Sequence, residues 1–232
     1  MLRARPSADA RFAPSGASRR PAPSPTAGVM TRERQKAMTP AQAIQALREG
    51  NARFIGERTR TRDLRAQAAI AEQFPFAAIV SCIDSRTSNE MLFDQGPGDI
   101  FSSRIAGNVI DPSVLGGLEF ACHIAGARAI VVVGHSSCSA VKGAIDRLQF
   151  GHMTALLQRI EPAVAQVAPQ FARRDSGDAC LVDAVTRANV RESMRCIREE
   201  STVLREMLER GELAIAGAVV DLATSRAEFL ED

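Results

Sequence analysis

The stretch "AIVVVGHSSCSAVKGAIDRL", residues 129–148, joins an apolar β-branched run to a segment of helical spacing through a short polar loop. Five consecutive apolar residues at 129–133 are typical of a strand that is buried on both faces, because such a strand shows no polar alternation. The residues at 139–148 carry apolar side chains at the period of a helix. The stretch therefore predicts a strand, loop and helix, with His135 and Cys138 in the loop at the carboxyl end of the strand.

The same alternation continues along the chain. Further apolar runs that predict strands lie at 77–81, 100–105 and 213–220. Segments of helical period lie between or around them, at 39–54, 115–127, 153–164 and 182–210. Because strands that alternate with helices form parallel sheets with helices on both faces, we predict an α/β fold with a mainly parallel twisted sheet. Thr39 as N-cap and Pro40 at the first helical position predict an N-terminal helical arm.

The start of the chain differs from the rest in composition. Residues 1–37 are rich in Pro, Ser, Ala and Arg and nearly free of acidic residues, so they offer no apolar face to bury. We predict a disordered tail at 1–37 and a single folded domain at 38–232. A transit peptide, or a start of translation at Met30 or Met38, would also explain the basic tail.

Charge and composition exclude several classes of partner. The 29 basic and 27 acidic residues leave a formal net charge of +2, so no overall field favours nucleic acid. No apolar run approaches the ~20 residues that a membrane-spanning helix needs. The 5 cysteines are an odd number in a chain of 232 residues, which favours a reducing compartment over a disulfide framework. We expect a cytoplasmic protein with no nucleic-acid and no membrane partner.

Cysteines follow two of the predicted strands. The run at 77–81 leads into Cys82, and the run that opens the first stretch leads to His135 and Cys138. Ligands bind open α/β sheets beyond the carboxyl ends of the strands, so these side chains meet if the two strands are neighbours. Two thiolates and one imidazole bind Zn²⁺ and leave a fourth position open, which is typical of a catalytic zinc site. Each cysteine considered alone is also consistent with a buried structural cysteine that binds no metal.

Asp84 and Arg86 follow the first of these cysteines. Residues two apart on an extended segment project to the same side, so the carboxylate and the guanidinium can form a bidentate pair. Asp84 then has two alternative partners: the metal, which would close the site, or Arg86, which would leave the fourth position open. A plain surface salt bridge is a third interpretation.

Three blocks of the sequence resemble the β-class carbonic anhydrase family in their order and spacing. The blocks are "CIDSR" at 82–86, "GDIFSSRIAGN" at 98–108 and "VVVGHSSC" at 131–138, and the resemblance extends over about residues 40–230. It implies an enzyme with one Zn²⁺ per chain that interconverts CO₂ and bicarbonate with release of a proton. It also implies a homodimer or a dimer of dimers, built on a catalytic domain that fills 38–232.

The resemblance implies a role for individual residues. It implies three zinc ligands: Cys82, His135 and Cys138. It implies a catalytic pair that orients the attacking water: Asp84 and Arg86. It implies a substrate pocket with one polar contact and two apolar walls: Gln73, Phe101 and Phe120.

Two positions depart from the family's usual pattern. Ser139 stands where a glycine usually follows the second cysteine, and Asn89 stands where a proline usually precedes a glutamate. Because Ser is a strong N-cap, we expect Ser139 to cap the next helix with a negative φ.

Two other functions use the same ligand set. A hydrolase of a CO₂ analogue, such as carbonyl sulfide or carbon disulfide, would need only a similar apolar pocket. A catalytically silent zinc-containing binding protein would need a fourth ligand, for which Asp84 is in position.

Overall fold

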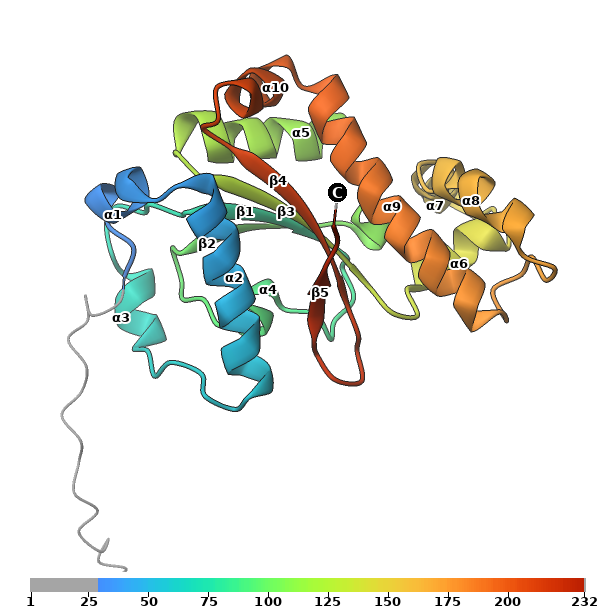
Figure 1. The fold of residues 1–232 in the computed structure, drawn as a ribbon, viewed down its shortest axis with the longest axis horizontal. Coiled ribbons are helices and arrows are strands. Elements are labelled where there is room, and N and C mark those ends of the chain that lie inside the picture. The colour runs from blue at the N-terminus through green and yellow to red at the C-terminus, as the bar shows by residue number, and fades with distance from the viewer. Residues whose placement is uncertain (1–28, 232) are drawn as a thin grey trace, which may run out of the picture.

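The computed structural model describes residues 29–231 and has an α/β architecture, shown in Figure 1. Its strands are β1 (Ala77–Ser81), β2 (Ile100–Arg104), β3 (Ala129–His135), β4 (Ala214–Val220) and β5 (Ala227–Phe229). Within the described residues they form a 5-stranded sheet in the order β2-β1-β3-β4-β5. The pairs from β2 to β4 are parallel, and β5 is antiparallel to β4. The predicted mainly parallel sheet is confirmed.

The helices connect and flank these strands. In chain order they are α1 (Arg32–Ala37), α2 (Pro40–Ile55), α3 (Leu64–Ala68), α4 (Asn89–Leu92), α5 (Pro112–Glu119), α6 (Ser139–Ile145), α7 (Gly151–Gln158), α8 (Glu161–Val167), α9 (Ala179–Glu200) and α10 (Thr202–Glu209). Shorter helical segments are η1 (Ala106–Asn108), η2 (Phe120–Ile124) and η3 (Ala168–Gln170). No helix in residues 29–231 is both long enough and apolar enough to cross a membrane.

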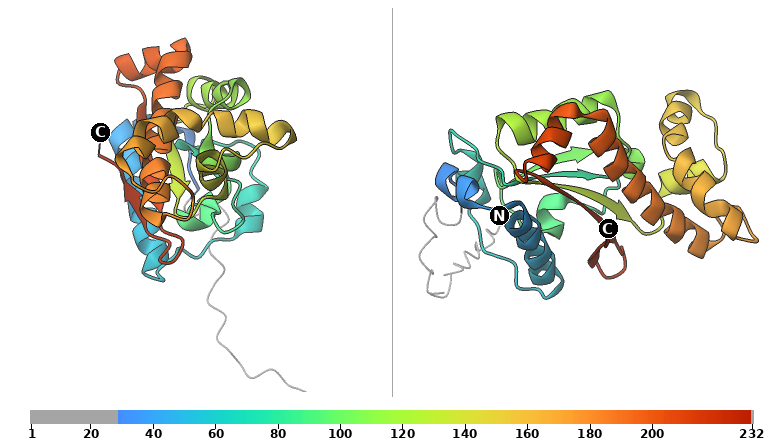
Figure 2. Two further views of the ribbon diagram at one scale, coloured as in Figure 1. Left: turned by 90° about the vertical axis from the view of Figure 1, so that its right-hand side faces the viewer. Right: turned by 45° about the horizontal axis from the view of Figure 1, so that its top comes forward.

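Helices cover both faces of the sheet, as Figures 1 and 2 show. On one face, Val80 and Val132 pack into a core with side chains of α5, α9 and α10. On the other face, Ile79 and Val131 pack with side chains of α2. Each such buried aliphatic side chain contributes roughly 1.5–3 kcal/mol relative to an exposed one. Successive side chains of these strands point to opposite faces, and both faces are buried. The strands therefore appear in the sequence as continuous apolar runs.

The N-terminal helical arm begins where the sequence predicts. The Thr39 hydroxyl accepts a hydrogen bond from the backbone N–H of Gln42, and the Gln42 side chain accepts one from the N–H of Thr39. This reciprocal capping box satisfies two N–H groups that the helix itself leaves free. Pro40 occupies the first turn of α2, as expected.

The tail expected at 1–37 is described only from residue 29, because residues 1–28 lie outside the described part of the chain. Residues 32–37 differ from the expected disorder and form α1. The reason is a distant contact of Gln35, whose side-chain amide donates to the carbonyl oxygens of Pro75 at 2.7 Å and Ala125 at 2.8 Å. The buried Gln35 therefore anchors α1 to two loops that its own sequence does not reveal.

Candidate metal centre and active site

The two strands that carry the predicted ligands are neighbours. Strands β1 and β3 pair in parallel, with Ser81 opposite Val133, so both end at the same edge of the sheet. Cys82 follows β1 directly, His135 ends β3, and Cys138 is the N-cap residue of α6. Their ligand atoms all lie within 4.8 Å of one another.

The environment of these side chains fits a metal ion. The sulfur atoms of Cys82 and Cys138 lie 3.9 Å apart, and both residues are buried. The Nδ1 atom of His135 lies 2.9 Å from the carbonyl oxygen of Ser136, which holds the proton on Nδ1 and directs a lone pair from Nε2. Among residues 29–231, this buried Nε2 has no hydrogen-bond partner. A buried polar atom without a hydrogen-bond partner costs free energy. A cation bound between this nitrogen and the two thiols would remove that cost.

The sulfur of Cys82 is prepared to act as a thiolate. The thiol of Cys138 donates toward it, and the N–H of Gly107, at 3.4 Å, also stabilises its charge. These interactions hold the pKa of Cys82 well below its usual range, although burial opposes them. The thiolate is the form that binds metals. Because the pKa of Cys82 is lowered, its sulfur can bind a metal ion without first losing a tightly held proton.

Asp84 is paired with Arg86 and not with the ligand set. The guanidinium donates from Nε to Oδ1 at 2.9 Å and from Nη2 to Oδ2 at 2.7 Å. The Oδ2 atom lies 3.9 Å from Nε2 of His135. The hydrogen bonds from Arg86 hold the pKa of Asp84 well below its usual range. Of the partners left open by the sequence, the structure has Arg86, and Asp84 lies outside the Cys82–His135–Cys138 group.

Arg104 contacts the loop that carries Cys82 and Asp84, a contact that the sequence does not predict. Its Nε donates to the carbonyl oxygen of Cys82 at 3.1 Å, and its Nη2 donates to the carbonyl oxygen of Asp84. The register places Arg104 opposite Ser81, so the end of β2 lies beside the ligand loop. Arg104 therefore holds the backbone that carries both Cys82 and Asp84. The one sequence feature that points to Arg104 is its position at the end of a predicted strand, the edge where ligands of parallel sheets bind.

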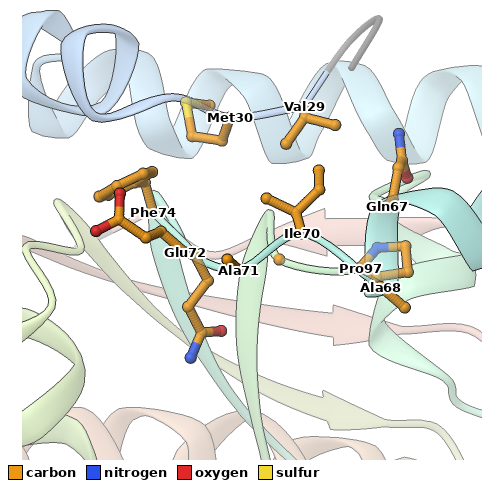
Figure 3. A pocket seen from close by; sticks show the side chains of 11 residues that line it. Val29, Met30, Gln67, Ala68, Ile70, Ala71, Glu72, Phe74 and Pro97 are labelled. Carbon is orange, nitrogen blue, oxygen red and sulfur yellow. The ribbon is translucent and has the colours of Figure 1, made fainter. Parts of the chain in front are cut away.

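Gln73 lies at the other end of β1 from the ligands. It precedes β1, whereas Cys82 follows it, and five extended residues span about 17 Å. Gln73 lines a cavity of about 360 Å³ between the Val29–Met30 segment and the segment from Ile70 to Phe74, shown in Figure 3. Within one chain, the structure thus does not bring Gln73 to the three ligands, because the whole of β1 separates them.

Phe101 and Phe120 contact each other. Their ring centroids lie 6.3 Å apart with an interplanar angle of 73°, an edge-to-face arrangement. Phe101 is half-buried on β2, opposite Ala78. Phe120 begins η2 and is 54% exposed. The structure therefore gathers two of the three implied pocket residues into one aromatic pair that is open to its surroundings.

The departure at Ser139 has a different geometry from the one expected. Cys138, with φ −62° and ψ 121°, is the N-cap residue of α6, and Ser139 is its first helical residue. The expectation that Ser139 itself caps the helix is wrong by one position, because Cys138 occupies the cap. The expected negative φ is confirmed, since the positive φ in this loop, 56°, belongs to Ser137.

Ser139→Gly is expected to have little effect. Ser139 is exposed, and its φ does not require glycine. We expect zinc binding to persist, stability to fall by about 0.5 kcal/mol from the lower helix propensity of Gly, and turnover to change by less than about threefold, roughly 0.7 kcal/mol of barrier. Zinc content, thermal unfolding and stopped-flow CO₂ hydration measure these three quantities. A tenfold rise in turnover would show that the hydroxymethyl group obstructs the substrate.

Asn89→Pro is expected to stabilise the protein. Asn89 is 0% exposed, and within residues 29–231 neither polar atom of its side-chain amide has a hydrogen-bond partner. It is the first residue of α4, where proline is favoured, and Ser88 before it is already extended. Since an unsatisfied buried polar group costs about 1–3 kcal/mol, we expect a gain of about 1 kcal/mol after some loss of packing. Urea denaturation measures it, with Asn89→Ala separating the loss of the amide from the effect of the ring. A lower midpoint for Asn89→Pro than for the wild type would contradict the prediction.

The fold and the site define a parallel α/β protein with a Cys–His–Cys centre at the carboxyl ends of two adjacent strands. The sequence model of the family described as "Carbonic anhydrase" matches residues 77–227. Carbonic anhydrase 2 of Mycobacterium tuberculosis is 38% identical over 197 residues, which cover 81% of this chain and 91% of that protein. The carbonic anhydrase of Mycolicibacterium smegmatis is 35% identical over 193 residues, covering 82% and 93%.

Solved structures agree with this relationship. The β-carbonic anhydrase CafA of Aspergillus fumigatus is 28% identical, with a TM-score of 0.62 over 68% of this chain and 76% of that one. Two β-carbonic anhydrases of Sordaria macrospora are described as tetrameric. One of them shares the fold at 21% identity, with a TM-score of 0.63 over 69% of this chain and 83% of that one. The chain belongs to the β-class carbonic anhydrase family, and the enzyme class predicted from its sequence blocks is confirmed.

Proposed function

We propose that this chain is a zinc enzyme that interconverts CO₂ and bicarbonate, with Cys82, His135 and Cys138 as the metal ligands. The observation that carries the proposal is the buried Nε2 of His135, which has no hydrogen-bond partner in the described part of the chain and lies within 4.8 Å of two thiol sulfurs. Membership of the carbonic anhydrase family supports the same reaction. When bound, Zn²⁺ would supply the Lewis acidity that ionises water near neutral pH.

The polar residues around the ligands would orient the reacting groups. The Asp84 carboxylate, held by Arg86, accepts a hydrogen bond from the attacking water and so directs a lone pair of that water toward the carbon of CO₂. The lowered pKa of Asp84 keeps it ionised, and therefore an acceptor, at neutral pH. Arg104 fixes the backbone on which Cys82 and Asp84 stand.

We also propose that the enzyme acts as a homodimer or a dimer of dimers. Gln73 and the Cys82 loop lie at opposite ends of β1, so a second copy is needed if Gln73 is to contact substrate at a metal centre. Ile83, beside the first ligand, is 59% exposed, and Phe120 is 54% exposed, which leaves apolar area for such a contact. Sedimentation equilibrium tests the assembly, and a fully active monomer would contradict it.

Zinc content measured together with stopped-flow CO₂ hydration tests the reaction. We expect one zinc per chain and a rate that rises from about pH 6.5 to 9 as the attacking water ionises. Faster turnover of carbonyl sulfide or carbon disulfide than of CO₂ would favour the hydrolase instead. Bound zinc with no turnover of any of these substrates would favour a silent binding protein.

A further inference from the structure

Asn189, on the buried side of α9, is linked to the ligand loop through a single residue. Its Nδ2 donates to the carbonyl oxygen of Gly107 at 2.8 Å. The N–H of Gly107 in turn lies 3.4 Å from the sulfur of Cys82. Asn189 is 1% exposed, so water does not compete for its amide. Two hydrogen bonds thus connect a helix side chain with no role in the proposed chemistry to a proposed metal ligand.

The residue between them has a backbone conformation that needs support. Gly107 has φ 67° and Asn108 has φ 46°, so two successive residues of η1 are left-handed. Such conformations persist when the surrounding structure fixes them. Here α9 supplies the restraint, because Ser193 donates from its hydroxyl to the carbonyl oxygen of Asn108 at 3.0 Å. Asn189 and Ser193 are one helical turn apart, so they face the same loop and bind successive carbonyl groups.

The direction in which the Gly107 N–H points decides whether it reaches the Cys82 sulfur. A Cβ atom at Gly107 would lie 2.6 Å from Cδ1 of Ile160, so the loop packs closely against Ile160 on that side. With the Asn189 bond in place, the loop is fixed on the α9 side as well. Without it, the buried carbonyl of Gly107 would lose this partner, and the loop would rearrange to satisfy it.

We propose that Asn189 is a positioning residue for the metal centre, which fixes the Gly107 N–H as a hydrogen-bond donor to the Cys82 thiolate. The inference rests on the proposed zinc site. A hydrogen bond to a ligand sulfur withdraws charge from it and fixes its position beside the other two ligands. Outer partners of metal ligands typically change metal affinity by 10–100-fold.

The test compares Asn189→Leu and Asn189→Ala with Thr186→Val. Leu has the branched shape of Asn but is larger and has no donor, and Ala removes the donor without adding volume. Thr186 is the matched control, because it is also 1% exposed on α9 but donates within its own helix, to the carbonyl oxygen of Val182 at 2.8 Å. Chelator competition measures Zn²⁺ affinity, and absorption of the Co²⁺-substituted protein reports the charge of the ligand sulfur.

We expect both Asn189 variants to bind Zn²⁺ at least about tenfold more weakly than the wild type. Their sulfur-to-Co²⁺ charge-transfer band is expected at longer wavelength, since a thiolate that loses a hydrogen bond gives up an electron more readily. Thr186→Val is expected to match the wild type in both measurements.

Each other outcome overturns a stated part of the proposal. Unchanged affinity and absorption in a folded Asn189 variant would overturn the positioning role. An equal shift in Thr186→Val, or failure of both Asn189 variants to fold, would assign Asn189 a general packing role instead. A wild-type protein that binds neither Zn²⁺ nor Co²⁺ would overturn the proposed zinc site itself.

Discussion

Cys138→Ala is expected to lose zinc and, with it, CO₂ hydration. The substitution leaves Cys82 and His135 as the remaining members of the ligand group, one fewer than a catalytic zinc site needs. It also leaves the buried Cys82 sulfur without the thiol that stabilises its charge. Since loss of an outer partner alone weakens metal binding by 10–100-fold, loss of a ligand should cost more than about 100-fold. Metal analysis after dialysis against a weak chelator measures the loss.

Cys180→Ser provides the matched control for this experiment. Cys180 is exposed near the start of α9 and belongs to no group of metal-ligating side chains found among residues 29–231. The variant removes one thiol, as Cys138→Ala does, and should keep one zinc per chain and wild-type turnover. Circular dichroism separates loss of metal from loss of fold. Full zinc retention by Cys138→Ala would overturn the ligand assignment.

The sequence predicted the parts of the fold that depend on local pattern. The apolar runs at 77–81 and 129–133 mark two central strands, because strands covered on both faces have few polar positions. Their polar ends then indicate the predicted ligands, and the adjacency of the two strands, which the structure supplies, brings these side chains together. Thr39 and Pro40 mark the start of α2 for an equally local reason, the capping of free N–H groups.

The features that depend on distant contacts were not predicted. Strand β5 has three residues, too few to show a period, and exists as a strand because it pairs with β4. Helix α1 is fixed by Gln35 through loops 40 and 90 residues away. Arg104 joins the site only through the register that sets it opposite Ser81.

The implied substrate pocket is a further feature that the sequence alone does not determine. The sequence resemblance assigned Gln73 to the pocket by position, and the folded chain places it beyond the far end of β1. A pattern read along one chain gives the order of residues, but not which copy of the chain supplies each side chain to a site. The geometry of a single chain shows that Gln73 does not reach the predicted ligands of its own chain.

Asp84→Asn is expected to keep zinc and lose most activity. Asp84 lies 3.9 Å from Nε2 of His135 and is bound to Arg86, so the ligand set does not depend on it. Asn keeps the shape of the side chain but presents an N–H₂ group where the carboxylate accepted hydrogen bonds. Loss of the group that orients the attacking water should lower turnover by about 10²-fold or more.

Asp175→Asn is the control for this prediction, because Asp175 also pairs with an arginine two residues away, Arg173, at 2.9 Å. That pair lies on the surface, and its loss should leave zinc content and turnover unchanged.

The pH dependence of the rate gives a further test of the role of Asp84. Because Arg86 lowers the pKa of Asp84 in the folded protein, the carboxylate is ionised throughout the range from about pH 6.5 to 9, in which the water ionises. Asp84→Asn should therefore lower the rate throughout that range, while the rise of the rate with pH persists and moves to lower pH because a nearby negative charge is lost. A rate that no longer rises with pH would mean that Asp84 itself titrates there, and loss of zinc would mean that Asp84 is a ligand and that the closed arrangement is the one the enzyme uses.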